Sequence, residues 1–384
     1  MEWKEVRLGD ILNFRRGHDL PHSAMKPGNI PVAGSNGVIG YHDTATPIKP
    51  ILTIGRSGNV GKPYFYEEAW AHNTTLYVDD FKGNDPKFLY YLCQTMPFAN
   101  FGGGSAVPTL NRNHIHPLET KIPVKVEDQR RIASILSSLD RKIELNNKIN
   151  ADLEEMAQAI FKNWFVDFEP FKDGKFVDSE LGMIPEGWKV VTLDDLTSKF
   201  GTGLNPRKNF VLGHGNNYYV TIKNMGNNRI YLNDRCDKVD DEALVKINKR
   251  SKLQKGDLLF SGIGTIGRVA MVVDDPVNWN TSESVFNMHP IDTVSSEFIY
   301  LLLLSDKFQQ YVQQNAQGGV QQGIRMASLK AFQLAIPDDL KTFDNLVKPI
   351  IAKVKNNDKE NDTLSLLRDT LLPRLMSGEI EIPE

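Results

Sequence analysis

Two short motifs carry residue types that bind phosphate or metal ions. Residues 55–62 hold three glycines and a lysine, but five residues separate Gly55 from Gly61, and Pro63 follows Lys62. A phosphate-binding loop needs a spacing of four at the first place and a serine or threonine at the second. A glycine-rich hairpin or bulge is the better interpretation. His114 and His116 have no third ligand spaced to join them, so the sequence predicts no metal site.

A third motif bears on methyl transfer. Phe200-Gly201-Thr202-Gly203 resembles part of a methyl-donor-binding loop but lacks its final glycine, and Gly-x-Gly is common in turns. An enzyme that methylates a flipped base also needs an Asp/Asn-Pro-Pro-Tyr/Phe motif, which is absent from the sequence. We therefore expect neither a catalytic residue nor a bound cofactor in this chain, and the missing motifs argue against an autonomous methyltransferase.

Basic and amide side chains near glycines form the strongest set of binding candidates. Lysine and arginine neutralise DNA phosphates, arginine reads guanine, and asparagine or glutamine reads adenine. Gly103-Gly104 and Gly318-Gly319 precede two of the groups and would let the backbone approach a groove. For each single residue the alternative is an ordinary solvated side chain. The predicted double-stranded DNA contacts are Arg15, Arg16, Arg56, Ser57, Asn59, Lys62, Asn111 and Arg112 in the first half of the chain, and Arg207, Lys208, Lys223, Asn224, Arg268, Gln321, Gln322 and Arg325 in the second.

An internal repeat organises these residues. Residues 3–11 return as 188–196, residues 54–62 as 260–268, and residues 88–90 as 298–300. The offset grows along the chain, which predicts insertions in the first half of the second copy. A repeat of this length indicates a duplicated domain rather than a solenoid. In each copy, glycine- and asparagine-rich segments with β-branched runs predict strands joined by tight turns.

A long helix is expected to follow each copy. Residues 124–169 contain neither glycine nor proline, and a helix of about 40 residues would be roughly 60 Å long. Apolar residues and two asparagines recur in steps of four and three, as in a coiled-coil seam. The C-terminal segment has the same steps, with its asparagines at the same places. The two seams are Ile132, Leu136, Leu139, Ile143, Asn146, Asn150, Leu153, Ala157, Ile160, Trp164 and Phe343, Val347, Ile350, Val354, Asn357, Asn361, Leu364, Arg368, Leu371, Leu375.

Antiparallel pairing of the two seams would place Asn146 opposite Asn361 and Asn150 opposite Asn357. A shift by one heptad would leave these amides against aliphatic groups, at a cost of about 1–3 kcal/mol for each unsatisfied group. The asparagines are therefore predicted to set the register. The alternative is that each helix packs only against its own domain. Pro349 either kinks the second helix or marks its start.

Composition favours a cytoplasmic protein. The 384 residues have a net charge of −3, mildly basic blocks alternate with acidic ones, and there are only two cysteines, too few for a disulfide framework. The N-terminus lacks the pattern of a signal peptide, and no apolar run is long enough to span a bilayer.

Several longer motifs are similar to one family. Residues 367–380, Leu-Arg-Asp-Thr-Leu-Leu-Pro-Arg-Leu-Met-Ser-Gly-Glu-Ile, resemble the closing signature of specificity subunits of Type I restriction–modification enzymes. Residues 129–140 resemble the opening of that family's central helix, and residues 185–189 the start of its second target-recognition domain. Residues 34–41 and 205–208 are similar to segments inside such domains. The second copy departs from the pattern at residues 341–345, where the Gln-Arg opening is missing.

The resemblance implies a non-catalytic subunit in which each recognition domain reads one half of a bipartite, asymmetric DNA site. The helices would set the spacing and dock two methylation subunits, and restriction subunits would complete the complex. S-adenosylmethionine, ATP and Mg²⁺ would be bound by those partners, and no membrane is involved. The alternative from the residues alone is a scaffold protein whose two domains bind other proteins.

The expected fold is α+β, with two mixed α/β domains separated by an antiparallel pair of long helices and related by a pseudo-twofold axis. The predicted boundaries are 1–125 for the first recognition domain, 126–169 for the central helix, 170–187 for a linker, 188–338 for the second recognition domain and 339–384 for the C-terminal helix.

Overall fold

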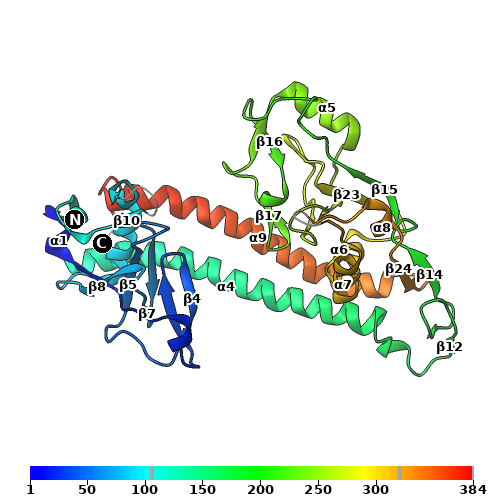
Figure 1. Cartoon of the computed structure of the whole chain (residues 1–384), viewed down its shortest axis with the longest axis horizontal. Coiled ribbons are helices and arrows are strands. Elements are labelled where there is room, and N and C mark those ends of the chain that lie inside the picture. The colour runs from blue at the N-terminus through cyan, green and yellow to red at the C-terminus, as the bar shows by residue number, and fades with distance from the viewer. Residues whose placement is uncertain (104–107, 319–321, 383–384) are drawn as a thin grey trace. The chain divides into compact units, whose positions relative to one another are not determined.

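The computed structural model describes residues 1–103, 108–318 and 322–382, and the chain forms two compact units (Figure 1). Unit 1 comprises Met1–Asn146 and Lys359–Glu384, and unit 2 comprises Asn147–Asp358. Each unit contains one mixed domain and parts of two long helices, α4 (Val126–Phe165) and α9 (Lys341–Met376). The fold class predicted from the sequence is confirmed.

The first domain lies in unit 1 and is built around a four-stranded antiparallel sheet and a three-stranded mixed sheet. The four-stranded sheet has the order β2-β8-β5-β6, the three-stranded sheet has the order β4-β3-β7, and β1 pairs with β11. The elements are β1 (Trp3–Arg7), α1 (Leu8–Ile11), β2 (Asn13–Arg16), β3 (Ile30–Gly34), β4 (Gly37–His42), β5 (Ile51–Gly55), β6 (Pro63–Tyr66), β7 (Trp70–Ala71), β8 (Thr75–Asp80), α2 (Pro86–Thr95), β9 (Gly102–Gly103), β10 (Thr109–Leu110), α3 (Arg112–Ile115) and β11 (Glu119–Pro123).

The second domain lies in unit 2 and repeats this topology. Its sheets have the orders β15-β23-β20-β21 and β19-β16-β22, and β14 pairs with β24. The elements are β12 (Phe176–Val177), β13 (Ile184–Pro185), β14 (Lys189–Thr192), β15 (Thr197–Thr202), β16 (Asn217–Val220), β17 (Met225–Gly226), β18 (Arg229–Ile230), β19 (Asp237–Val239), α5 (Asp241–Ser251), β20 (Leu258–Ser261), β21 (Val269–Met271), β22 (Trp279–Thr281), β23 (Val285–Pro290), α6 (Ser296–Leu304), α7 (Asp306–Asn315), α8 (Met326–Lys330) and β24 (Gln333–Ile336).

The duplication extends to strand direction and helix capping. In both three-stranded sheets the central strand pairs antiparallel with one neighbour and parallel with the other. Helix α2 begins after Asp85, whose carboxylate accepts from the Phe88 amide at 2.8 Å, and α6 begins after Ser295, whose hydroxyl accepts from the Phe298 amide at 3.1 Å. A side-chain oxygen at this position satisfies a free amide of the first turn. The repeated sequences therefore build the same elements twice.

Two insertions distinguish the second domain. Between β16 and β19 the chain adds the short antiparallel hairpin β17–β18, and between β19 and β20 it adds α5. The two-residue turn of the hairpin is Asn227-Asn228, with φ of 46° and 56°. Asparagine tolerates this left-handed backbone, which two-residue hairpin turns require. These insertions account for the growing offset between the two copies.

Parts of α4 and α9 pair antiparallel inside each unit. In unit 1, Ile132 and Leu136 of α4 share a core with Leu372 and Leu375 of α9. In the same unit, Asn146 Nδ2 donates to Asn361 Oδ1 at 3.0 Å. Residue numbers therefore increase along α4 while they decrease along the facing part of α9, so the two helices are antiparallel here.

Unit 2 continues the arrangement. Asn357 Nδ2 donates to Asn150 Oδ1 at 2.8 Å, and the rings of Trp164 and Phe343 lie 5.7 Å apart. The same pairs were predicted from the sequence by aligning the asparagines of the two seams. The alternative of two helices packed only against their own domains does not hold. Pro349 does not mark the start of α9, because that helix begins at Lys341.

Candidate nucleic-acid interface

A basic cavity in the first domain gathers five of its eight predicted DNA contacts. Arg15 and Arg16 come from β2, Arg56 follows β5, and Asn111 and Arg112 lie at the start of α3. The cavity has a volume of about 430 Å³, and Leu76, Thr109 and Leu110 complete its lining. Four guanidinium groups and one amide around a single opening can bind phosphate and read base edges.

Backbone contacts bring these segments together. The Leu110 amide donates to the Arg56 carbonyl at 2.7 Å, and Ser57 forms a bridge with Thr109, so the loop after β5 lies against β10. Gly55 permits the turn, because a Cβ there would lie 1.8 Å from the Asn59 carbonyl oxygen. The position of Arg56 therefore depends on a glycine that no other residue can replace without a backbone shift.

The cavity arginines have weak intramolecular partners. Arg15 pairs with Asp79 and Arg16 with Asp19, both at 3.3 Å, and these arginine side chains are 63% and 55% exposed. Exposed pairs of this kind contribute little to stability, so a phosphate can compete for the same guanidinium groups. The Asn73 amide, assisted by Arg16, holds the pKa of the Asp19 carboxyl below its ordinary value.

Arg56 and Arg112 are positioned by backbone carbonyls. Arg56 donates to the Asn73 carbonyl at 3.3 Å, and Arg112 donates to the Phe14 carbonyl at 3.2 Å. One carbonyl uses only part of a guanidinium's donors, and the remaining donors stay available to a ligand.

The other three candidates of the first domain, Ser57, Asn59 and Lys62, lie on the loop between β5 and β6. Asn59 and Lys62 are exposed, and the Lys62 ammonium lies 5.2 Å from the Tyr64 ring centre.

His116 has a structural role beside this cavity. Its Nε2 accepts from the Phe14 amide at 3.1 Å, and its ring stacks on Phe14. Burial, together with Arg112 and Lys82, lowers the pKa of His116, and Nε2 can accept this hydrogen bond only when it carries no proton. Within residues 1–103, 108–318 and 322–382, no three histidine, cysteine, aspartate or glutamate side chains are grouped as metal ligands.

Two candidates in the second domain have structural tasks instead. Asn224 is buried, and its Oδ1 accepts from the Thr221 amide and hydroxyl at 2.9 and 3.1 Å, so it caps a turn. Arg268 Nη1 donates to the carbonyls of Ile222 and Met225 at 2.7 and 2.6 Å. We therefore withdraw Asn224 as a DNA contact and assign Arg268 to the support of this segment.

The other candidates in the second domain are accessible where the structure describes them. Arg207, Lys208, Lys223, Gln322 and Arg325 are exposed. Gln321 lies outside the described residues, as do Gly104 and Gly319.

The second domain does not repeat the arginine cluster. The Ile324 amide donates to the Gly262 carbonyl at 2.9 Å, as Leu110 does to Arg56, so Gly262 occupies the place of Arg56. The strand registers and this hydrogen bond together show which residues of the second domain are equivalent to the cavity residues. Arg15 and Arg16 correspond to Gly201 and Thr202, Arg56 corresponds to Gly262, and Asn111 and Arg112 correspond to Arg325 and Met326.

A basic residue that was not among the predicted contacts lies near Thr202, the position equivalent to Arg16. Arg250, at the end of α5, donates to Thr202 Oγ1 at 3.4 Å. Because α5 is an insertion without a counterpart in the first domain, the repeat offered no signal for this residue.

The matches to known proteins agree with this architecture. The Type I restriction modification DNA specificity domain matches residues 1–155 and 185–365, and the chain belongs to this family. Within restriction–modification systems it is a specificity subunit, the component that recognises DNA.

Individual relatives support the assignment. The Type I restriction enzyme MjaIX specificity subunit of Methanocaldococcus jannaschii is 29% identical over 78% of this chain and 70% of its own length. The HindI specificity subunit of Haemophilus influenzae is 27% identical, over 98% and 94%. The crystal structure of the Type I restriction–modification S subunit from M. genitalium has the same fold, with a TM-score of 0.61 at 15% identity over 100% of this chain and 97% of that one.

In the described part of the chain, no helix combines the length and the apolar content that a membrane span requires.

Proposed function

We propose that this chain is the non-catalytic DNA-reading subunit of a Type I restriction–modification complex. Residues 1–125 and 188–338 each read one half of a bipartite, asymmetric site, and the helix pair sets the gap between the halves. The observation that carries this proposal is the cavity in the first domain, where four arginines and one asparagine from three separate segments face one opening.

Reading in the first domain uses two kinds of contact. The exposed Arg15 and Arg16 exchange their carboxylate partners for phosphates, which anchors the domain and releases counterions. Asn111 and Arg112, held at the start of α3, contact base edges, since asparagine pairs with adenine and arginine with guanine. The second domain reads its half through Arg207, Lys208, Lys223, Arg250, Gln322 and Arg325.

The helices supply the docking surface for two methylation subunits. Leu366 of α9 is 70% exposed and Leu145 of α4 is 52% exposed in unit 1, and Met156 and Leu346 are similarly exposed in unit 2. Large apolar side chains on solvent-facing helix positions favour a protein partner. Those partners supply the methyl transfer and bind S-adenosylmethionine, restriction subunits bind ATP and Mg²⁺, and the complex acts in the cytoplasm.

A mobility-shift titration tests the proposal. The full chain, with and without its methylation subunits, is mixed with duplex DNA across a salt series. Binding that weakens steeply with salt, and that weakens further when Arg16 and Arg56 are replaced by alanine, supports the proposal. Absence of DNA binding under every condition would instead favour the scaffold protein.

A further inference from the structure

The β17–β18 hairpin, residues 225–230, belongs to the second domain but contacts both long helices. It is an insertion, because β3 and β4 of the first domain are joined by a two-residue turn instead. All the contacts described below lie inside unit 2. The hairpin therefore has a place in the architecture that the duplication does not explain.

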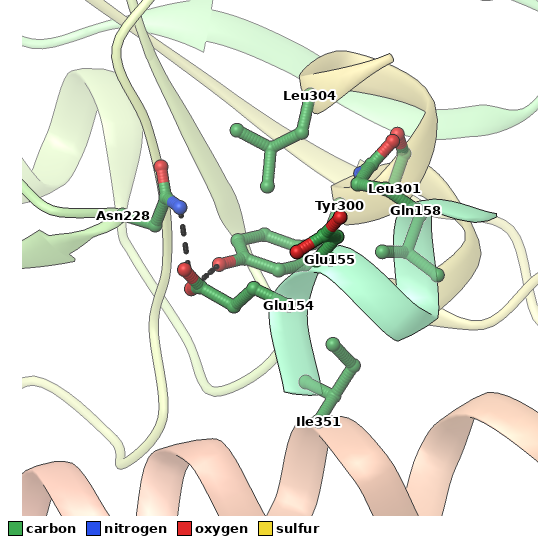
Figure 2. A pocket seen from close by; sticks show the side chains of 8 residues that line it. All are labelled: Glu154, Glu155, Gln158, Asn228, Tyr300, Leu301, Leu304 and Ile351. Atoms are coloured by element: carbon green, nitrogen blue, oxygen red, sulfur yellow. Dashed lines mark hydrogen bonds between the residues drawn. The ribbon is translucent and has the colours of Figure 1, made fainter. Parts of the chain in front are cut away.

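The turn residue Asn228 contacts α4 and α9 together. Its Nδ2 donates to Glu154 Oε1 on α4 at 3.2 Å (Figure 2). Its carbonyl accepts from Lys355 Nζ on α9 at 3.2 Å. The Tyr300 hydroxyl of α6 donates to the same Glu154 oxygen at 3.3 Å. One turn thus joins both helices to the body of the second domain.

Lys355 is 8% exposed, and its ammonium lies 4.8 Å from the centre of the Tyr300 ring. Burial lowers the pKa of this lysine, while Asp358 and Glu154 act in the opposite direction. A buried ammonium that loses a hydrogen-bond acceptor is costly, so the Asn228 carbonyl is strongly retained as its partner.

The next hairpin residue contacts the asparagine layer of the helix pair. Arg229 Nη1 lies 3.5 Å from Asp358 Oδ1, and the same oxygen accepts from Asn150 Nδ2 at 3.0 Å. Asn150 in turn accepts from Asn357. The hairpin is therefore bound at the heptad step that defines the helix register in this unit.

The other side of the hairpin is fixed to the second domain. Met225 is buried in a core cluster with Leu259 and Val285, and its carbonyl accepts from Arg268, the last residue of the loop between β20 and β21. A cavity of about 220 Å³ lies beside the turn, and Asn228, Leu301 and Leu304 are among its lining residues (Figure 2). At this cavity the Asn228 side chain contacts α4 through its hydrogen bond to Glu154.

We infer that the β17–β18 hairpin is a positioning element that fixes the second domain on the helix pair through Asn228 and Arg229, and so determines which gap between half-sites the complex accepts. The part of this inference that concerns the gap between half-sites rests on the proposed function. The part that concerns how the second domain is held on the helices does not. The partner of the hairpin is the helix pair of its own chain.

The test uses three variants of the full chain. Arg229→Met removes the charge that contacts Asp358, and Asn228→Gly removes the amide that contacts Glu154 while glycine keeps the left-handed turn. Arg235→Met is the matched control, since Arg235 is an exposed arginine of the same insertion. Arg229→Lys, as a rescue variant, keeps the charge and should restore much of the wild-type behaviour.

The first readout is the distance between spin labels at Lys353→Cys on α9 and Val277→Cys in the second domain, two exposed positions of unit 2. The native cysteines are buried and should not be labelled. Arg229→Met and Asn228→Gly should broaden the distance distribution, and Arg235→Met should not. Unchanged distributions in both hairpin variants would overturn the inference even if the chain never bound DNA.

The second readout is methylation, by the complex with its methylation subunits, of duplexes whose half-sites are separated by different gaps. The preference for the wild-type gap over a gap one base pair longer should fall about tenfold in Arg229→Met. An unchanged preference would refute the role of the hairpin in choosing the gap. Failure of the wild-type complex to methylate any duplex would refute the proposed function and leave the distance result standing.

Discussion

Asn150 and Asn357 form a hydrogen-bonded pair at 2.8 Å between antiparallel helices, and both side chains are buried. Asn150 also donates to the Val354 carbonyl at 3.3 Å and to Asp358 at 3.0 Å. Its two amide protons and its oxygen are thereby all engaged. Such a saturated polar group inside an apolar seam penalises any register that separates its partners.

The first prediction concerns this pair. Asn150→Leu should lower the free energy of unfolding by about 1–3 kcal/mol, because the buried amide of Asn357 loses its acceptor. Asn150→Leu combined with Asn357→Leu should recover a large part of that loss, since two apolar groups then face each other. Urea denaturation of the single and double variants measures the difference. If the double variant lost as much free energy of unfolding as the two single variants added together, the two asparagines would not be coupled.

A second prediction separates the two domains by their salt dependence. Arg15→Ala with Arg16→Ala should reduce the slope of log affinity against log salt by about 2, one for each phosphate contact. Thr202→Ala, at the position equivalent to Arg16, should leave that slope unchanged. Arg250→Ala should reduce it by about 1. A slope that responds equally to Thr202→Ala and to the arginine variants would contradict the assignment of the cavity.

A third prediction concerns the glycine that shapes the cavity loop. Gly55→Ala should destabilise the chain by about 2 kcal/mol or more, because the new Cβ meets backbone oxygen at 1.8 Å and the loop must move. DNA affinity should fall with it, as Arg56 is displaced. Gly103→Ala is the control for stability, since a Cβ there has nothing within 4 Å. Thermal unfolding of both variants, with a binding titration of Gly55→Ala against the wild type, provides the comparison.

The fourth prediction concerns pH. Burial lowers the pKa of His116 and also that of His72 from the ordinary value of 6.5. The unfolded chain therefore binds more protons than the folded one, so these groups stabilise the fold above pH 6.5, and that contribution is lost as the pH falls through their folded pKa values. His116→Gln keeps an acceptor for the Phe14 amide but does not titrate. Its free energy of unfolding should vary less between about pH 7.5 and 5 than that of the wild type, and an equal variation would contradict the role of His116.

The helix pair could be predicted from the sequence because its signal is periodic. Ten matched positions, two of them asparagines at equal places, are enough to determine a pairing, and the hydrogen bonds of Asn146 and Asn150 join those same partners. The strand segments were recognisable for a similar reason, since the duplicated motifs repeat with their turns. Local periodicity and repetition carry this information in the chain itself.

The site was predictable only in part. Arg15, Arg56 and Arg112 lie far apart in the sequence and meet because β10 packs against the loop after β5, which no local pattern reveals. Arg268 has the same side chain as these residues, but it supports the β17–β18 hairpin, whose contacts arise from a non-repeated insertion. Residue type indicates what a side chain can bind, and tertiary packing decides whether it is free to do so.

The central claim is that one domain reads one half of the site. Mapping of methylated adenines in cells that express the complex, with either the wild-type chain or the Asn111→Ala and Arg112→Ala variants, tests it most directly. We expect the recognised sequence to lose base preference in one half, while the other half and the gap stay the same. Loss of preference in both halves, or in neither, would contradict the claim.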